Sequence, residues 1–137
     1  MVLTYLAKYK DAGILILRLG VGILFIRHGA PKLCSGPEQW NQLGGAMGYL
    51  GITFLPTVWG FMAASAELFG GICLILGIFT RTASALLFLT MVVATVFHLG
   101  QGQGIQAATP AIENGIIFLS LICIGPGKYS LEALLCR

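Results

Sequence analysis

Charge is scarce in this sequence. Only 9% of the 137 residues are Asp, Glu, Lys or Arg, whereas a soluble domain has about 25%. This scarcity excludes a nucleic-acid-binding domain, which needs a basic surface, and a disordered tail, which needs many charges and few apolar residues. The same composition excludes a disulfide-stapled secreted module.

Motifs for metals and redox cofactors are absent too. The cysteines have no C-x-x-C spacing, no H-E-x-x-H motif occurs, and the chain has no flavin, haem or iron–sulfur motif. We therefore predict no intrinsic cofactor, no metal site and no catalytic residues. Cys73 and Cys123 fall at similar depth in the expected helices, and two small core residues are favoured over a redox pair.

Hydrophobic residues, in contrast, are abundant. They make up 57% of the chain, and the mean hydropathy is +0.90. The 19 glycines fit the same interpretation, because glycine is more frequent in transmembrane helices than in soluble ones. The composition thus predicts an integral membrane protein whose main partner is the lipid bilayer.

Four segments are long and apolar enough to be membrane-spanning helices, which need about 20 residues each. The third is the most uniform, with no ionisable group before His98, and the fourth stops where a Gly-Pro-Gly turn begins at Gly125. We predict one all-α domain over residues 1–137, an integral membrane four-helix bundle. Its expected spans are about residues 13–33, 57–78, 82–99 and 111–125.

The cations outside these spans favour one orientation. The positive-inside rule places segments rich in Lys and Arg on the cytoplasmic side. In a four-span chain, five such cations fall on one side: Lys8, Lys10, Arg81, Lys128 and Arg137. We therefore expect both termini in the cytoplasm and the protein in the cell (plasma) membrane.

The link between the first two spans, residues 34–56, is then extracytoplasmic. Its 23 residues are too many for a simple turn between adjacent helices. The stretch EQWNQLGGAMGYL within it predicts a short helix lying over the bundle, and its aromatic residues suit the membrane interface. An interfacial anchor and a lid over a ligand site both remain open.

Ionisable residues inside the spans are the main functional signal, because each costs free energy in lipid. With odd spans running outward and even spans inward, four of them reach one depth in the outer half of the bilayer. These are His28, Lys32, His98 and Glu113, with Glu67 near the middle of the membrane. Four groups at one depth predict a polar pocket.

A buried ion pair between Arg18 and Glu67 is expected below that pocket. Glu67 lies in a stripe of small residues on the second span, which allows close helix approach, and the long Arg18 side chain can extend along its helix. Fixing the helix register and binding a ligand are both open roles for this pair. Arg27 points away from Arg18 and is expected to extend toward the outer interface.

The chemistry of the predicted pocket suits several ligands. Imidazoles, an ammonium and carboxylates can hold the carbonyl groups of a quinone or an oxyanion, and they can pass protons. A metal held by His28, His98, Glu67 and Glu113 is disfavoured, because these residues lack a compact ligand spacing.

Three stretches of the chain resemble the DoxX family of small four-helix membrane proteins: LRLGVGILFIRHGAPKL, AELFGGICLILGIFTRTASALL and IENGIIFLSLICIGPGKYSLEALL. The residues that carry the resemblance are Arg18, His28-Gly29, Lys32, Glu67, Gly70-Gly71, Gly77, Thr80-Arg81, Glu113 and the ending that begins at Gly125. The resemblance implies association with thiosulfate:quinone oxidoreductase subunits or with membrane redox complexes that partner soluble oxidative-stress enzymes. Distant relatives resemble assembly chaperones for membrane proteins.

Three functions therefore stand as hypotheses. The favoured one is a redox accessory subunit that binds quinone and couples to a partner enzyme, which would carry the cofactor. A non-catalytic membrane adaptor or chaperone is the second. A small-solute or proton pathway is the third, disfavoured because the chain has no inverted repeat or paired broken helices. The sequence leaves a homo-oligomer open.

Overall fold

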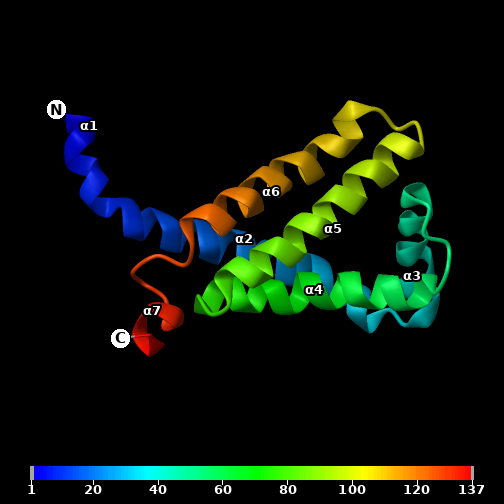
Figure 1. Cartoon of the computed structure of the whole chain (residues 1–137), viewed down its shortest axis with the longest axis horizontal. Helices are drawn as coiled ribbons and strands as arrows, with labels where there is room; N and C mark the ends of the chain where they lie inside the picture. Colours follow the sequence, from blue (N-terminus) through cyan, green and yellow to red (C-terminus); the bar gives the residue numbers. More distant parts are fainter. Residues whose placement is uncertain (1, 137) are drawn as a thin grey trace.

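The computed structural model describes residues 2–136, and all regular structure in that part of the chain is helical (Figure 1). The helices are α1 (Val2–Tyr5), the 3-10 helix η1 (Leu6–Tyr9), α2 (Lys10–Cys34), α3 (Pro37–Gly44), the 3-10 helix η2 (Gly45–Leu50), α4 (Pro56–Leu76), α5 (Thr80–Gly100), α6 (Ile105–Ile124) and α7 (Leu131–Leu135).

Four of these elements are long and apolar enough to cross a membrane: the continuous run Leu3–Cys34, which includes α2, and the helices α4, α5 and α6. The prediction of an all-α membrane bundle with four spans is therefore confirmed. The two termini lie at the same end of the molecule (Figure 1), as an even number of spans requires.

The fourth span begins earlier than expected. It was predicted from residue 111, after Pro110, but α6 starts at Ile105 and contains Pro110 within it. Proline removes one backbone hydrogen bond, from its own nitrogen to the carbonyl oxygen four residues earlier, which is that of Gln106, and membrane helices tolerate this loss. The Asn114 side chain donates to the carbonyl oxygen of Pro110 itself, at 2.9 Å.

Small residues set the distance between α2 and α4. A Cβ atom on Gly22 would lie 2.7 Å from the carbonyl oxygen of Gly71, and one on Gly29 would lie 2.6 Å from the backbone nitrogen of Leu68. Any larger residue at these positions would push the two helices apart. The small residues on α4 serve three contacts: Gly71 packs against α2, Gly70 faces Leu87 of α5, and Gly60 faces Trp40 of α3.

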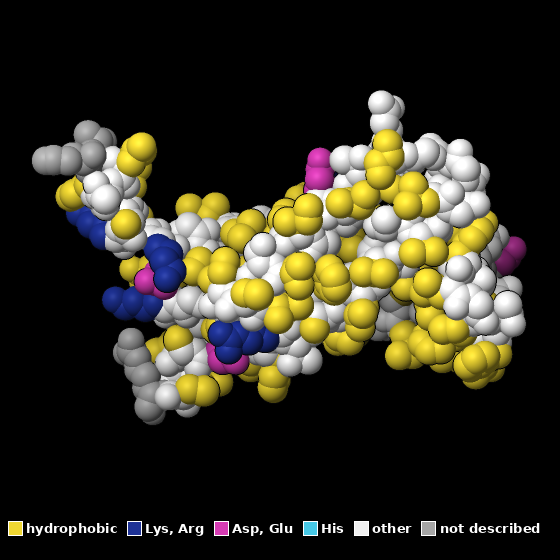
Figure 2. Space-filling model, turned by 45° about the horizontal axis from the view of Figure 1, so that its top comes forward, with side chains coloured by type: hydrophobic (Ala, Val, Ile, Leu, Met, Phe, Trp, Pro, Cys, Tyr) yellow, Lys and Arg dark blue, Asp and Glu magenta, His cyan; other side chains and the backbone are white. Residues whose placement is uncertain are grey.

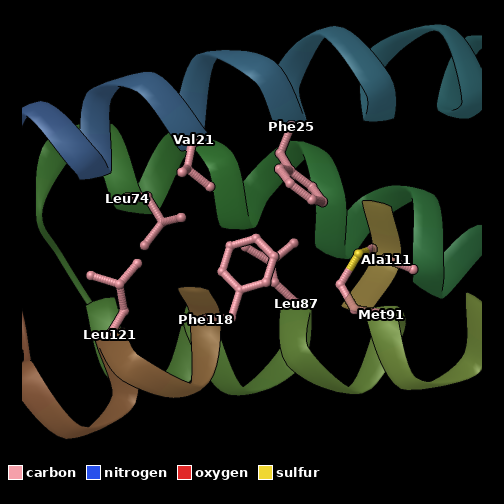
Figure 3. Close-up of a cluster of buried hydrophobic side chains, with 8 residues drawn as sticks. All are labelled: Val21, Phe25, Leu74, Leu87, Met91, Ala111, Phe118 and Leu121. Atoms are coloured by element: carbon pink, nitrogen blue, oxygen red, sulfur yellow. The ribbon is translucent and has the colours of Figure 1, made fainter. Parts of the chain in front are cut away.

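A cluster of buried apolar side chains joins the α2–α4 pair to the α5–α6 pair (Figure 3). Across this cluster the Phe25 and Phe118 rings meet edge to face, with centroids 4.9 Å apart. The members of the cluster are Val21, Phe25, Leu74, Leu87, Met91, Ala111, Phe118 and Leu121.

The predicted short helix in the 34–56 link is confirmed as α3, which continues into η2. Three contacts hold this segment on the bundle. The Trp40 indole donates to the carbonyl oxygen of Lys32 at 3.0 Å, its ring packs on Phe61 with centroids 4.9 Å apart, and the Tyr49 ring packs on Phe97. The segment thus lies against α2, α4 and α5 at the end opposite the termini.

Candidate functional site

The centre of the candidate site is an ion pair between α2 and α4. The Lys32 ammonium donates to both carboxylate oxygens of Glu67, at 3.1 and 3.0 Å. The Glu67 side chain is only 5% exposed, whereas that of Lys32 is 31% exposed. The carboxylate is therefore buried between helices, and its partner faces open space.

This pairing corrects the expected Arg18–Glu67 ion pair. Among residues 2–136, Glu67 pairs with Lys32, and the fully buried Arg18 instead donates to the backbone carbonyl oxygens of Leu74, at 3.0 Å, and of Tyr129. Depth explains the difference, because Leu74 lies seven residues beyond Glu67 on α4, or about 10 Å along the helix. Arg18 is level with the end of α4 and not with its middle.

A cavity of about 310 Å³ opens beside the Lys32–Glu67 pair, between α2, α4, α5 and the α3–η2 segment. Its polar lining residues are Lys32, Gln39, Gln42, Glu67, Thr90 and His98. Its apolar lining residues are Leu43, Ala46, Ala63, Val93, Ala94 and Phe97. The cavity thus combines hydrogen-bonding groups with an apolar wall, as small-molecule sites do.

Three of the five residues expected to share one pocket do line this cavity, and two do not. Lys32, Glu67 and His98 are in its lining. His28 is exposed on α2, where its ring packs on Phe25 with centroids 6.0 Å apart, and Glu113 is exposed on α6, a helix that adds nothing to the lining. A common depth along the helices does not place residues on the same face of the bundle.

Sequence reasoning missed the lining residues on the link. Gln39, Gln42, Leu43 and Ala46 follow the spacing i, i+3, i+4, i+7, which puts them on one side of a helical segment. That pattern was present in the stretch predicted to be a short helix. It indicates that the segment covers the cavity as well as lying at the membrane interface.

The His98 side chain has a defined orientation. Its Nδ1 atom is 2.5 Å from Oε1 of Gln103, whose amide nitrogen donates to Gln101 at 2.8 Å. With the amide oxygen of Gln103 as acceptor, Nδ1 carries the proton, and in a neutral imidazole Nε2 is then a hydrogen-bond acceptor. The cavity therefore has a donor in the Lys32 ammonium and, in the tautomer with its proton on Nδ1, an acceptor in Nε2 of His98.

A second polar cluster lies at the other end of the bundle, and we call it the Arg18 node. It consists of Arg18, Leu74, Gly77, Tyr129 and Ser130. Gly77 has a φ of +69°, and a Cβ atom there would collide with the Arg18 guanidinium and lie 2.5 Å from Cβ of Ser130. Ser130 caps α7 by accepting from the backbone nitrogen of Ala133 at 3.1 Å. The node fixes the chain after α6 against the end of α4.

All four cysteines of the chain are free thiols in the structure. Cys73 is partly buried, but Cys123 is exposed, so the expectation of two core residues does not hold for Cys123. Its position on α6 faces outward from the bundle.

Comparison with known proteins finds one matching family and several similar proteins. The family model DoxX matches residues 13–100. The Escherichia coli (strain K12) "Inner membrane protein YqjF" is 31% identical over 135 residues, covering 93% of this chain and 95% of that protein. An uncharacterized protein of Haemophilus influenzae is 30% identical over 133 residues, covering 93% of each chain.

A third relative has a name that states a class of activity. The Bacillus subtilis (strain 168) protein "Putative oxidoreductase CatD" is 34% identical over 89 residues, covering 65% of this chain and 61% of that protein. No solved structure matches the chain.

Proposed function

The chain belongs to the DoxX family of membrane proteins, and we propose that it is a membrane redox accessory subunit that binds a quinone or a similar amphiphile in the cavity beside Lys32 and Glu67. One observation carries the proposal: a buried ion pair between membrane-spanning helices opens onto a cavity with an apolar wall. An ion pair that served only to join α2 and α4 would not need such a cavity. The name of the Bacillus subtilis relative supports a redox role.

The donors and acceptors of the cavity suit an aromatic head group that has two oxygens. The Lys32 ammonium has three N–H groups, and Glu67 accepts two of them, so one remains for a ligand oxygen. The amide groups of Gln39 and Gln42 add further donors, and Nε2 of His98 can accept from a hydroxyl. Phe97 offers an aromatic face for the ring.

Reduction of a quinone to a quinol takes two electrons and two protons. Groups that line the cavity can move protons, and the positive charge of Lys32 stabilises negative charge that develops on the ligand oxygen. The electrons must come from a partner enzyme with a reduced redox cofactor. We therefore assign the chain a binding and coupling role and no catalytic residue.

The proposed location is the cell (plasma) membrane, with both termini in the cytoplasm. Most of the visible lysine and arginine side chains gather at the end that holds the termini (Figure 2). This distribution supports the orientation expected from the positive-inside rule. A membrane-impermeant thiol reagent added outside intact cells should label Cys34 and leave Cys136 unlabelled, and the reverse pattern would refute the orientation.

Thermal unfolding of the purified protein with ubiquinone and menaquinone analogues tests quinone binding. A ligand that binds only the folded state stabilises it by about 2.7 kcal/mol at a hundredfold excess over its dissociation constant. We expect such a shift in the wild type, a smaller one in Lys32→Met and His98→Ala, and an unchanged one in His28→Ala, the matched histidine outside the cavity.

The absence of a shift with every quinone tested would contradict the proposal. If a specific protein copurified in that case, the second hypothesis, a non-catalytic adaptor or assembly chaperone, would be favoured. Equal loss of binding in His28→Ala and His98→Ala would show that the quinone binds elsewhere than in the cavity.

A further inference from the structure

A second cleft lies at the end of the bundle that holds the termini (Figure 1), and we call it the terminal cleft. It opens between the end of α4 and the chain that follows α6, and its volume is about 510 Å³. Its lining residues are Ile75, Leu76, Lys128, Tyr129, Ser130, Leu131 and Leu134. None of them lines the cavity beside Lys32 and Glu67, so the two sites are separate.

The walls of the terminal cleft are mostly apolar. Leu76, Leu131 and Leu134 are exposed side chains. Leu76 is the last residue of α4, so the cleft lies at the level where this membrane-spanning helix ends. Leu131 and Leu134 are three residues apart on α7, which puts them on one side of that helix. Exposure of these side chains to water costs free energy, whereas contact with a lipid acyl chain removes that cost.

The charged group of the terminal cleft is the Lys128 ammonium. It lies 6.0 Å from the centroid of the Tyr129 ring, which also lines the cleft. Among residues 2–136, no acidic side chain forms an ion pair with Lys128. The Asp11 carboxylate accepts instead from the backbone nitrogen of Lys128, at 3.1 Å. The ammonium therefore remains available to an anion that enters the cleft.

The charge around the terminal cleft is positive. Apart from the buried Arg18, the described chain places four cations and two acids at this end of the bundle: Lys8, Lys10, Arg81, Lys128, Asp11 and Glu132. Lysine and arginine side chains gather there in Figure 2. Glu132 does not line the cleft, and its carboxylate accepts from the backbone nitrogen of Thr80 at 3.5 Å. This end of the bundle therefore attracts anionic head groups.

We propose that the terminal cleft binds one anionic phospholipid from the leaflet on the side of the termini. The phosphate pairs with Lys128 at the membrane surface, and an acyl chain covers Leu76 and Leu134 and continues along α4 into the bilayer. A phospholipid combines both features of the cleft, because its charge lies at the surface and its apolar part points inward. A soluble phosphate compound would leave the apolar walls uncovered.

The bound lipid would contact both α4 and α7, and so it would hold the chain that follows α6 on the bundle. This role adds to that of the Arg18 node, which joins the same two segments from the inside. The fully buried Arg18 does not line the terminal cleft. The inference does not depend on quinone binding, because the quinone cavity lies at the other end of the bundle.

Native mass spectrometry of the full chain, released from nanodiscs of equal parts phosphatidylcholine and phosphatidylglycerol, tests the proposal. We expect the wild type to retain one phosphatidylglycerol in preference to phosphatidylcholine. Lys128→Gln should lower this preference about fivefold, since one lysine near an anionic membrane contributes about 1 kcal/mol. Lys128→Arg should keep the preference, and Leu134→Gln should reduce retention of the lipid because it places an amide against the acyl chain.

Two matched controls lie close to the cleft without lining it. Lys8→Gln removes a cation from the same end of the bundle, and Leu135→Gln changes the neighbouring exposed leucine of α7. Both should retain phosphatidylglycerol like the wild type. Equal retention of the two lipids by the wild type, or an equal loss in Lys8→Gln and Lys128→Gln, would overturn the proposal. Displacement of the lipid by glycerol 3-phosphate would do so too, because it would indicate a site for phosphate alone.

Discussion

Two cations on α2, Arg18 and Lys32, have opposite surroundings. Arg18 and Lys32 are fourteen residues apart on roughly the same side of the helix. Arg18 is fully buried and donates to two backbone carbonyl oxygens. Lys32 is 31% exposed, donates to a carboxylate and lines a cavity. Although both are cations within a membrane-spanning helix, one is enclosed by the fold and the other faces a space that a ligand can fill.

A charged residue within a membrane-spanning helix therefore does not by itself mark a binding site. The planar guanidinium has five N–H donors and can satisfy carbonyl oxygens left free at a helix end, which the Arg18 node does for the end of α4. The ammonium of Lys32 has only three donors, and Glu67 accepts two of them, so one remains for a ligand. Two features thus distinguish the structural site from the candidate binding site. Arg18 bonds backbone carbonyl oxygens and is enclosed, whereas Lys32 bonds a carboxylate and lies beside a cavity.

The largest effect is expected at the Arg18 node. Arg18→Met would leave the carbonyl oxygens of Leu74 and Tyr129 without their donor, and hydrogen bonds from charged groups are worth about 1.5–3 kcal/mol each. We therefore expect a loss of about 3 kcal/mol or more in the free energy of unfolding, measured by steric trapping in bicelles. Arg81→Met, at an exposed arginine, is the control. An Arg18→Met protein as stable as wild type would show that the node does not stabilise the fold.

A smaller effect on stability is expected at the candidate site. Glu67→Gln leaves the Lys32 ammonium without its counter-charge, but Lys32 is partly exposed and can be solvated within the cavity. We expect a loss of about 1–3 kcal/mol in unfolding free energy, below that of Arg18→Met. Quinone-induced stabilisation should fall in Glu67→Gln and persist in any Arg18 variant that folds. The reverse order of the two stability losses would refute the assignment of structural and binding roles.

The smallest effect is expected from Ser130→Ala within the Arg18 node. Ser130 accepts from the backbone nitrogen of Ala133 and donates to the carbonyl oxygen of Gly127 at 2.9 Å. Loss of an N-cap costs about 1 kcal/mol. We expect this loss without any change in quinone binding, together with faster proteolysis after α6. Slower or unchanged proteolysis would indicate that α7 docks without its cap.

The amino-acid sequence predicted much of this architecture. Long apolar segments must form helices in lipid, because backbone groups there have no water to bond, and so composition and segment length determined the four spans. The boundary at Pro110 was wrong because proline removes only one backbone hydrogen bond, to the carbonyl of Gln106, and α6 continues through it. The short helix in the 34–56 link was predicted because 23 residues are too many for a simple turn, whereas its helical spacing of cavity-lining residues was missed.

Sequence alone thus determined the helices and the family resemblance, since both depend on local composition and order. Only the tertiary structure decided which residues at one depth share a face. It paired Glu67 with Lys32 and enclosed Arg18 beneath the returning C-terminal segment. It also left His28 and Glu113 outside the cavity. The position of a residue along its own helix is a local property of the chain. Its partners depend instead on how each helix is rotated and on which other helices it contacts, and those helices can be far apart in the chain.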